Sequence, residues 1–140
     1  LNPQTPLECM EYLTDYMDMA LIMTVSPGFA GQKLFAGAER KTAAARKMLD
    51  ELGHADMPIE VDGNISLENG RKLSLCGADI FVLGTSSLFI KGKSLTEAAE
   101  EVKKLRKFFL TSVTRIFMNS AVLSHGKQVV KLNGNLHLIG

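Results

Sequence analysis

The chain has 140 residues and a net charge of +1, and 46% of its residues are hydrophobic. This length and composition are typical of one globular domain with a modest core. No apolar run approaches the roughly 18 residues that a membrane-spanning helix requires, so we expect no membrane partner.

The charges are unevenly distributed along the chain. Residues 1–101 contain 15 acidic and 9 basic residues, whereas residues 102–140 contain 7 basic residues and no acidic ones. Such a break can mark a separate function or an unrelated extension, so we divide the chain into a domain at 1–109 and a basic tail at 110–140. A basic tail can bind nucleic acid, but positive charge is favourable at a helix end anyway, so we expect no nucleic-acid partner.

The first half of the chain contains signals for two helices and one strand. Thr5-Pro6-Leu7-Glu8 is a capping box with proline at the first helical position, which predicts a helix to about Tyr16. Residues 19–25 form a continuous apolar run, typical of a strand buried on both faces. Residues 36–52 are rich in good helix formers and end before Gly53, which predicts a long helix.

The alternation of helices and strands continues in the second half. Residues 58–61 and 78–83 are predicted strands, and residues 66–76 are a predicted helix with a serine N-cap. A second capping box at Ser94 opens a helix that we expect to reach about Phe108. This alternation predicts an α/β fold with parallel strands, as either a doubly wound sheet or part of a (β/α)8 barrel.

The basic tail departs from this alternation. Its residues 128–132 and 136–139 flank Asn133-Gly134, which is a strong hairpin signal. We expect no fourth strand–helix unit in residues 110–140, and the rest of the tail is unassigned.

Asp62 is the most informative candidate residue. It follows the short run Ile59-Glu60-Val61 and precedes a glycine-containing turn. A carboxylate at the end of a buried strand is costly unless it is paired, bound to a metal or used in catalysis. Asp-Gly is also a common turn, so a structural role for Asp62 is the alternative. Glu60 shares the same side of the strand, and we expect it to hydrogen bond with a basic side chain in the interior.

Two glycine-rich loops follow predicted strands, as does the turn after Asp62. Gly28, Ala30 and Gly31 lie in the first loop, and Gly84-Thr85 opens the second. Backbone N–H groups in such loops bind anions, and barrel enzymes build phosphate sites from loops of this kind. Either loop alone is equally compatible with a tight turn. Together they favour a phosphorylated substrate handled by acid–base chemistry.

The cysteines and histidines carry little functional signal. Cys9 and Cys76 are isolated in the sequence, which predicts reduced thiols in a cytoplasmic protein. His54, His125 and His137 lack the spacing of metal ligands, and we expect none of them to be catalytic.

Five segments of the chain form a recognisable set. They are Leu1-Asn2-Pro3-Gln4-Thr5-Pro6, Met23-Thr24-Val25-Ser26-Pro27-Gly28-Phe29-Ala30-Gly31-Gln32-Lys33, Glu60-Val61-Asp62-Gly63-Asn64-Ile65, Gly77-Ala78-Asp79 and Gly84-Thr85-Ser86. Together they resemble the ribulose-phosphate 3-epimerase family, in which they occur in the same order and at about the same spacing, over residues 1–107. The segment of the form MTV-x-PGF-x-GQ is highly specific, and EVDG adds to it.

The resemblance implies a (β/α)8 barrel, of which this chain holds about strands six to eight with their helices. It implies interconversion of D-ribulose 5-phosphate and D-xylulose 5-phosphate, a step of the pentose phosphate pathway. In that family two Asp residues on opposite faces of the substrate exchange a proton through an enediolate. A divalent metal bound by those Asp residues and two His stabilises the enediolate, and zinc, iron, manganese and cobalt all suit such ligands.

The resemblance also assigns roles to individual residues. Asp62 matches the second Asp, which is both acid/base and metal ligand. Met23 matches a Met beside the reacting carbons, and the loop Gly28-Phe29-Ala30-Gly31 matches one that borders the substrate. The turns at Gly63-Asn64 and Gly84-Thr85 match turns that hold phosphate, although Asn64 stands where many members have a second Gly.

Strands one to five of the family barrel have no counterpart here, and the other Asp and both His ligands go with them. We therefore expect a piece of a longer barrel with two open sheet edges, unstable or inactive alone. We expect it to form a homo-oligomer or to pair with an N-terminal half-barrel. The alternatives to the epimerase are an allulose-6-phosphate 3-epimerase and a non-catalytic sugar-phosphate-binding remnant, which would tolerate Asp62→Asn.

Overall fold

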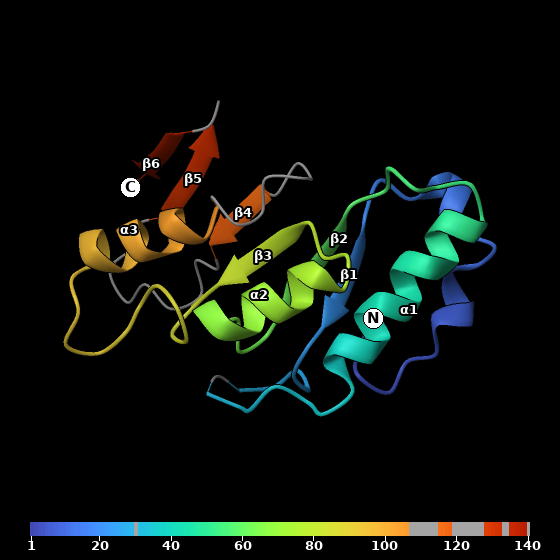
Figure 1. The fold of residues 1–140 in the computed structure, drawn as a ribbon, viewed down its shortest axis with the longest axis horizontal. Helices are drawn as coiled ribbons and strands as arrows, with labels where there is room; N and C mark the ends of the chain where they lie inside the picture. Colours follow the sequence, from blue (N-terminus) through green and yellow to red (C-terminus); the bar gives the residue numbers. More distant parts are fainter. Residues whose placement is uncertain (30, 107–114, 119–127, 133–134, 140) are drawn as a thin grey trace.

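The computed structural model describes residues 1–29, 31–106, 115–118, 128–132 and 135–139, with side chains described for 1–29 and 31–102. Its main feature is a four-stranded parallel sheet with the strands in chain order (Figure 1). The strands are β1 (Ala20–Met23), β2 (Ile59–Asp62), β3 (Ile80–Leu83) and β4 (Arg115–Met118).

Three helices connect successive strands of this sheet (Figure 1). They are α1 (Ala38–Glu51), α2 (Leu67–Leu75) and α3 (Leu95–Arg106). A doubly wound sheet reverses its strand order at a switch point, whereas this sheet runs in order throughout, as the sheet of a (β/α)8 barrel does. The fold class is therefore the predicted one, a partial (β/α)8 barrel.

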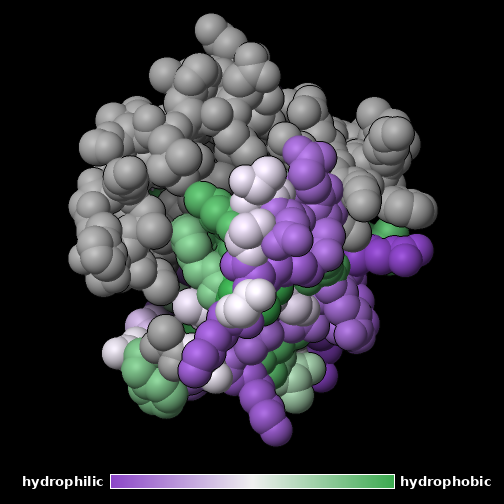
Figure 2. Space-filling model, turned by 90° about the vertical axis from the view of Figure 1, so that its left-hand side faces the viewer, coloured by the Kyte–Doolittle hydropathy of each residue, from purple (hydrophilic) through white to green (hydrophobic). Residues whose placement is uncertain are grey.

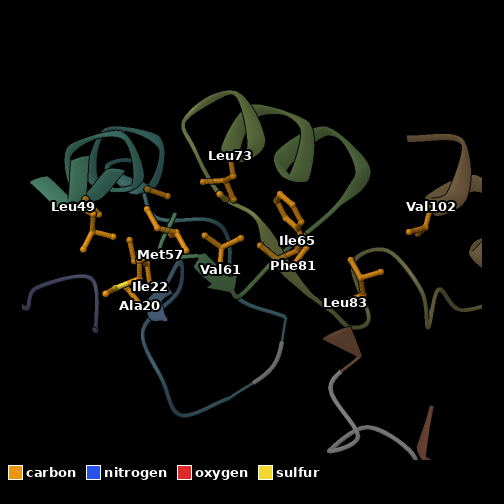
Figure 3. Packing of buried hydrophobic residues seen from close by; sticks show 14 of the residues in the cluster. Ala20, Ile22, Leu49, Met57, Val61, Ile65, Leu73, Phe81, Leu83 and Val102 are labelled. Carbon is orange, nitrogen blue, oxygen red and sulfur yellow. The ribbon is translucent and has the colours of Figure 1, made fainter. Parts of the chain in front are cut away.

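The helices pack against one face of the sheet. Ile22, Val61 and Phe81 are buried at corresponding positions of β1, β2 and β3. Leu49 of α1 and Leu73 of α2 lie over these strands in the same buried cluster (Figure 3). Burying each such side chain contributes roughly 1.5–3 kcal/mol, so this layer is the main source of stability.

The opposite face of the sheet carries the acidic residues. Successive side chains of a strand point to opposite faces, so Glu60 and Asp62 point away from the side of Val61. Met23 and Val82 are the neighbours of Asp62 in the register and share its face. The sheet therefore separates a helix-covered apolar side from a side that presents carboxylates.

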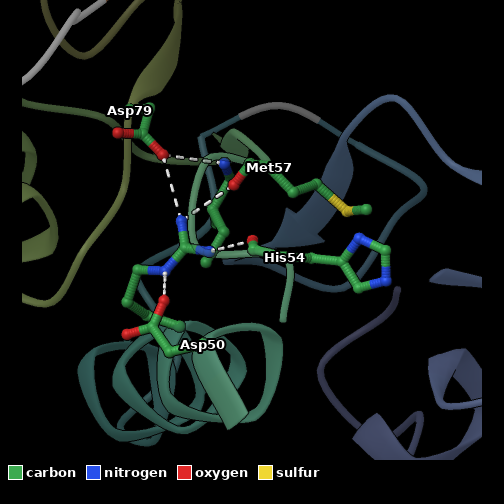
Figure 4. Close-up of polar contacts among 6 residues, drawn as sticks. Asp50, His54, Met57 and Asp79 are labelled. Atoms are coloured by element: carbon green, nitrogen blue, oxygen red, sulfur yellow. Dashed lines mark hydrogen bonds and ion pairs between the residues drawn. The ribbon is translucent and has the colours of Figure 1, made fainter. Parts of the chain in front are cut away.

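Arg46 of α1 ties the helix to the amino ends of β2 and β3 (Figure 4). Its Nη1 donates to the Met57 carbonyl at 2.8 Å, and its Nη2 donates to the His54 carbonyl at 3.1 Å. Nη1 also lies 3.6 Å from Oδ2 of Asp79, which accepts a 2.9 Å hydrogen bond from the Ile59 N–H. The contacts of Arg46 thus hold the amino ends of two neighbouring strands in place.

The predicted helix from Thr5 to about Tyr16 is wrong. The segment forms two short 3-10 turns, η1 (Leu7–Met10) and η2 (Thr14–Tyr16), and the N-cap of η1 is Pro6, without a side-chain cap hydrogen bond. Most side chains in this segment are exposed. Short helices depend on burying an apolar face, and this segment does not bury one long enough to support a regular helix.

The two other helix starts agree with prediction. Ser66 caps α2, because its Oγ accepts a 3.1 Å hydrogen bond from the Asn69 N–H. Ser94 and Glu97 form the predicted capping box at α3, in which the Glu97 carboxylate accepts from the Ser94 N–H at 3.0 Å and the Ser94 Oγ accepts from the Glu97 N–H at 3.3 Å. The predicted end of α3 at Phe108 lies outside the described residues.

The tail contains the predicted hairpin and an unexpected strand. β5 (Gln128–Leu132) and β6 (Asn135–Ile139) pair in antiparallel fashion, while the turn at 133–134 lies outside the described residues. β4, for which the sequence carries no strand signal, adds to the sheet in parallel with β3, and no helix follows it among the described residues. Four residues without flanking helix signals are too short to identify as a strand from the sequence.

The two edges expected to be open are thus partly occupied. β4 pairs along the whole of β3. At the other edge, the Leu1 amine donates to the Leu21 carbonyl at 2.6 Å, and the Leu1 carbonyl accepts from the Met23 N–H at 2.8 Å. These contacts satisfy backbone groups that would otherwise be available to other chains.

No described helix combines the length and apolar character that crossing a membrane requires. Seen from the α3 side, the described surface presents hydrophilic groups over much of its area, beside smaller hydrophobic areas (Figure 2).

Candidate active site

The carboxyl ends of the first three strands lie level with one another. Met23 is the register partner of Asp62, and Asp62 is the register partner of Val82. Because the strands are parallel, the loops that follow them all leave the same edge of the sheet. The sheet therefore brings together the candidate residues that are far apart in the sequence.

A pocket of about 440 Å³ opens at this edge, a volume suited to a small molecule. The predicted site residues that line it are Met23, Gly28, Phe29, Gly31, Asp62, Gly63, Asn64, Gly84 and Thr85. Ala30, the remaining predicted residue, lies outside the described part of the chain. Ser26, Gln32 and Ser86 also line the pocket and were missed. Gln32 was visible in the PGF-x-GQ segment, but its contacts depend on how the loop folds.

The Asp62 carboxylate is partly buried at the floor of the pocket. Burial raises its pKa above the ordinary value of 3.8. Glu60, which is 9% exposed, also has a raised pKa, first because of burial and then because of the negative charge of Asp62. Neither carboxylate pairs with another described residue, so the basic partner expected for Glu60 is not found in this part of the chain. Carboxyl groups shifted in this direction are suited to proton transfer.

Thr24 holds the turn that follows Asp62. Its buried hydroxyl lies 2.9 Å from the Asp62 carbonyl and 2.5 Å from the Gly63 carbonyl, and its N–H donates to the Asp62 carbonyl at 2.7 Å. Gly63 has a φ of 120°, and a Cβ there would lie 2.5 Å from a methyl of Val25. Glycine is therefore required for this close approach of the turn to the first loop.

The pocket offers backbone donors but no cationic side chain. No Lys or Arg is found among its described lining residues. The backbone N–H groups of Asn64 and Thr85 donate no hydrogen bond to any of the described residues. Unpaired N–H groups at the end of a parallel sheet can bind an anion without a cationic side chain.

The glycine-rich loop after β3 folds into a compact turn well before the predicted helix start at Ser94. After β3 the Gly84 carbonyl accepts from the N–H groups of Ser87, Leu88 and Phe89, at 2.9–3.2 Å, and α3 begins only at Leu95. The N-terminus of α3 therefore does not follow Gly84 directly. The compact turn presents Gly84 and Thr85 to the pocket instead.

A divalent metal does not fit the described residues by themselves. No group of three or more His, Cys, Asp or Glu side chains in the described part of the chain could hold an ion. Asp62 is the carboxylate in the pocket that is placed to serve as one ligand. A complete site would need further ligands.

Comparisons with known proteins match most of the chain to one family. The model of the ribulose-phosphate 3 epimerase family matches residues 1–89. The chain is 40% identical to ribulose-phosphate 3-epimerase of Serratia marcescens over 85 residues, covering 61% of this chain and 40% of that protein. Over 107 residues it is 38% identical to the chloroplastic ribulose-5-phosphate-3-epimerase of Arabidopsis thaliana, covering 76% of this chain and 37% of that protein. The chain thus spans about 40% of the length of the relatives it matches.

Proposed function

Because the chain belongs to the ribulose-phosphate 3-epimerase family, we propose that it forms part of the active site of a phosphoketose 3-epimerase. The observation that carries the proposal is the position of Asp62. Its carboxylate lies in a pocket at the carboxyl edge of a parallel sheet, beside loops suited to an anion. Active sites of barrel enzymes lie at this edge.

In the proposed reaction Asp62 transfers a proton at C3 of the substrate. Its carboxylate takes the C3 proton, and the electron pair of the broken C–H bond moves into the C2 carbonyl to form an enediolate. A second acid on the opposite face then returns a proton to C3, which inverts that carbon. The raised pKa of Asp62 supports this role, because a base is most effective when its pKa is closer to the working pH.

The substrate's phosphate is proposed to bind the backbone N–H groups of Asn64 and Thr85. These groups lie in turns at the ends of neighbouring strands, and both turns line the pocket. Each charge-assisted hydrogen bond of this kind contributes about 1.5–3 kcal/mol.

We also propose that the active site binds a divalent metal, although the described residues supply only part of its ligand set. Asp62 would contribute one ligand, and a bound cation would supply stabilisation of the enediolate oxygens. The described residues by themselves do not complete a site for the ion, and further ligands would have to come from elsewhere.

The second acid is proposed to come from a partner. A homo-oligomer or an N-terminal half-barrel would place another residue on the opposite face of the substrate. The free thiols of Cys9 and Cys76 are consistent with the predicted cytoplasmic location.

The test is a coupled assay that follows conversion of D-ribulose 5-phosphate to D-xylulose 5-phosphate by the full chain. It is run with and without the N-terminal half-barrel of a relative, and D-allulose 6-phosphate serves as a comparison substrate. Asp62→Asn should reduce the rate about 1,000-fold, because the amide cannot accept the C3 proton. Asp56→Asn, at an exposed position, is the matched control and should leave the rate unchanged.

Two outcomes contradict the proposal. An Asp62→Asn variant that keeps the wild-type rate excludes Asp62 from proton transfer. A folded wild-type chain that stays inactive with its complement, yet binds the sugar phosphate, favours the non-catalytic remnant.

A further inference from the structure

The first loop of the pocket is held by the side chain of Gln32. Its Nε2 donates to the Ser26 carbonyl at 2.5 Å and to the Phe29 carbonyl at 2.9 Å. The described part of this loop has no helix or strand, and the Phe29 side chain is 74% exposed. The loop's shape therefore depends on these side-chain contacts and not on a regular backbone ladder or a packed core.

Asn64 connects this loop to the turn after β2. Its Nδ2 donates to the Gln32 carbonyl at 2.6 Å. Its Oδ1 accepts from Nδ2 of Asn69 at 2.9 Å, and the same Nδ2 group donates to the Asn64 carbonyl at 2.9 Å. A carbonyl only accepts, so these partners set the orientation of both amides.

Asn69 itself is fixed in the first turn of α2. Its N–H donates to the N-cap oxygen of Ser66, and its side chain reaches back to Asn64. Asn64 and Gln32 line the pocket, whereas Asn69 does not. Asn69 therefore lies one residue behind the pocket wall, and within the described part of the chain its link to the first loop runs through Asn64.

Asn64 has a φ of 52°, in the left-handed region that glycine adopts most easily. Asparagine tolerates this region better than most residues and adds an amide that glycine lacks. Asn64 can therefore adopt the backbone conformation of the turn and also donate a hydrogen bond to the neighbouring loop.

We propose that Asn69 is a positioning residue, which acts through Asn64 and Gln32 to hold the described pocket residues Gly28, Phe29 and Gly31 in the shape that the substrate pocket requires. We call the hydrogen bonds from Asn69 to Asn64 and from Asn64 to Gln32 the bridge. The effect of the bridge on catalysis rests on the proposed function, but the bridge itself is present without substrate. Binding groups on a loop are effective only when the loop is already in place, since ordering it on binding costs affinity.

The test uses the full chain with Asn69→Asp. This substitution keeps the shape of the side chain but replaces its donor with an acceptor, which cannot donate to either oxygen of Asn64. An acid is favourable in the first turn of a helix, so α2 is not weakened. Glu68→Gln, at the preceding exposed position, is the matched control.

The first readout is the backbone NMR order parameter of the chain without ligand. Asn69→Asp should lower the order parameters of Gly28, Phe29, Gly31 and Gln32 into the flexible range below about 0.6, while those of α1 and β2 stay as in the wild type and Glu68→Gln changes neither. The second readout is the epimerase assay, in which Asn69→Asp should raise KM about tenfold and lower kcat less.

Unchanged order parameters at Gly28, Phe29, Gly31 and Gln32 overturn the bridge. Lower order parameters with unchanged KM and kcat overturn its role in the reaction. A wild-type chain that stays inactive with its complementary half-barrel, but whose loop is freed by Asn69→Asp, counts against the proposed function and supports the bridge.

Discussion

The two ends of the same strands are built differently. At the amino ends, Arg46 donates hydrogen bonds to two carbonyls and lies beside the Asp79 carboxylate. At the carboxyl ends, Asp62 is partly buried and pairs with no described residue, which raises its pKa. One end satisfies its polar groups and the other leaves a carboxylate unpaired. The difference teaches that stability and chemistry are separated along each strand, as in barrel enzymes generally.

The largest expected loss of stability comes from Gly63→Ala at the carboxyl end. The added Cβ would lie 2.9 Å from the Val25 backbone nitrogen, and the φ of 120° is unfavourable for alanine. Overlap and strain together should lower the free energy of unfolding by about 3 kcal/mol, measured by urea denaturation followed by circular dichroism. Gly53→Ala, where a Cβ would meet nothing within 4 Å, should cost only about 1 kcal/mol. Equal losses of stability in the two variants would show that the close approach of Gly63 to Val25 contributes nothing.

Arg46→Met should be the next largest effect and should act on stability alone. It keeps the stem of the side chain but leaves the Met57 and His54 carbonyls without their donor. The free energy of unfolding should fall by about 2 kcal/mol, with KM and kcat unchanged. Lys47→Met removes only an exposed ion pair with Glu51 and should cost almost nothing. A change of KM in Arg46→Met would show that the amino ends of the strands also influence substrate binding at the carboxyl ends.

Ser66→Ala should produce a smaller loss, because it removes the N-cap of α2 at the carboxyl side of the sheet. Losing the hydrogen bond to the Asn69 N–H should cost about 1 kcal/mol in thermal or urea unfolding. Ser74→Ala, later in the same helix, is the control. If both variants melt at the same temperature as the wild type, the cap does not stabilise α2.

Asp62→Asn should have the smallest effect on stability and the opposite sign. The folded-state pKa of Asp62 is raised, so its stabilising contribution is complete below the unfolded pKa of about 3.8 and is lost as pH rises through the folded pKa. The variant cannot ionise and should therefore be more stable than the wild type at pH 7. This difference should disappear as pH falls toward 4, while exposed Asp18→Asn shows no such trend. A variant less stable than the wild type at pH 7 would mean that the carboxylate is favourably paired.

Local sequence signals predicted much of the fold. The Ser66 and Ser94 caps, the helix stop at Gly53 and the strand–helix alternation all depend on neighbouring residues, and the structure has them at these positions. The capping-box pattern at Thr5 misled, because a cap cannot support a helix without an apolar face to bury. β4 was missed because its pairing with β3 joins segments more than thirty residues apart.

The sequence by itself determined that Asp62 is the last residue of one strand and that glycine-rich loops follow two other strands. Residue order and local propensity decide those features. Only the tertiary structure decided that the carboxyl ends of the three strands lie level and that burial raises the pKa of Asp62. It also decided that Arg46 connects α1 to the amino ends of β2 and β3. The bridge from Asn69 through Asn64 to Gln32 belongs to the same class. These features depend on how the chain folds in three dimensions, including contacts such as Gln32 with Asn64 that join residues far apart in the chain, which residue order does not specify.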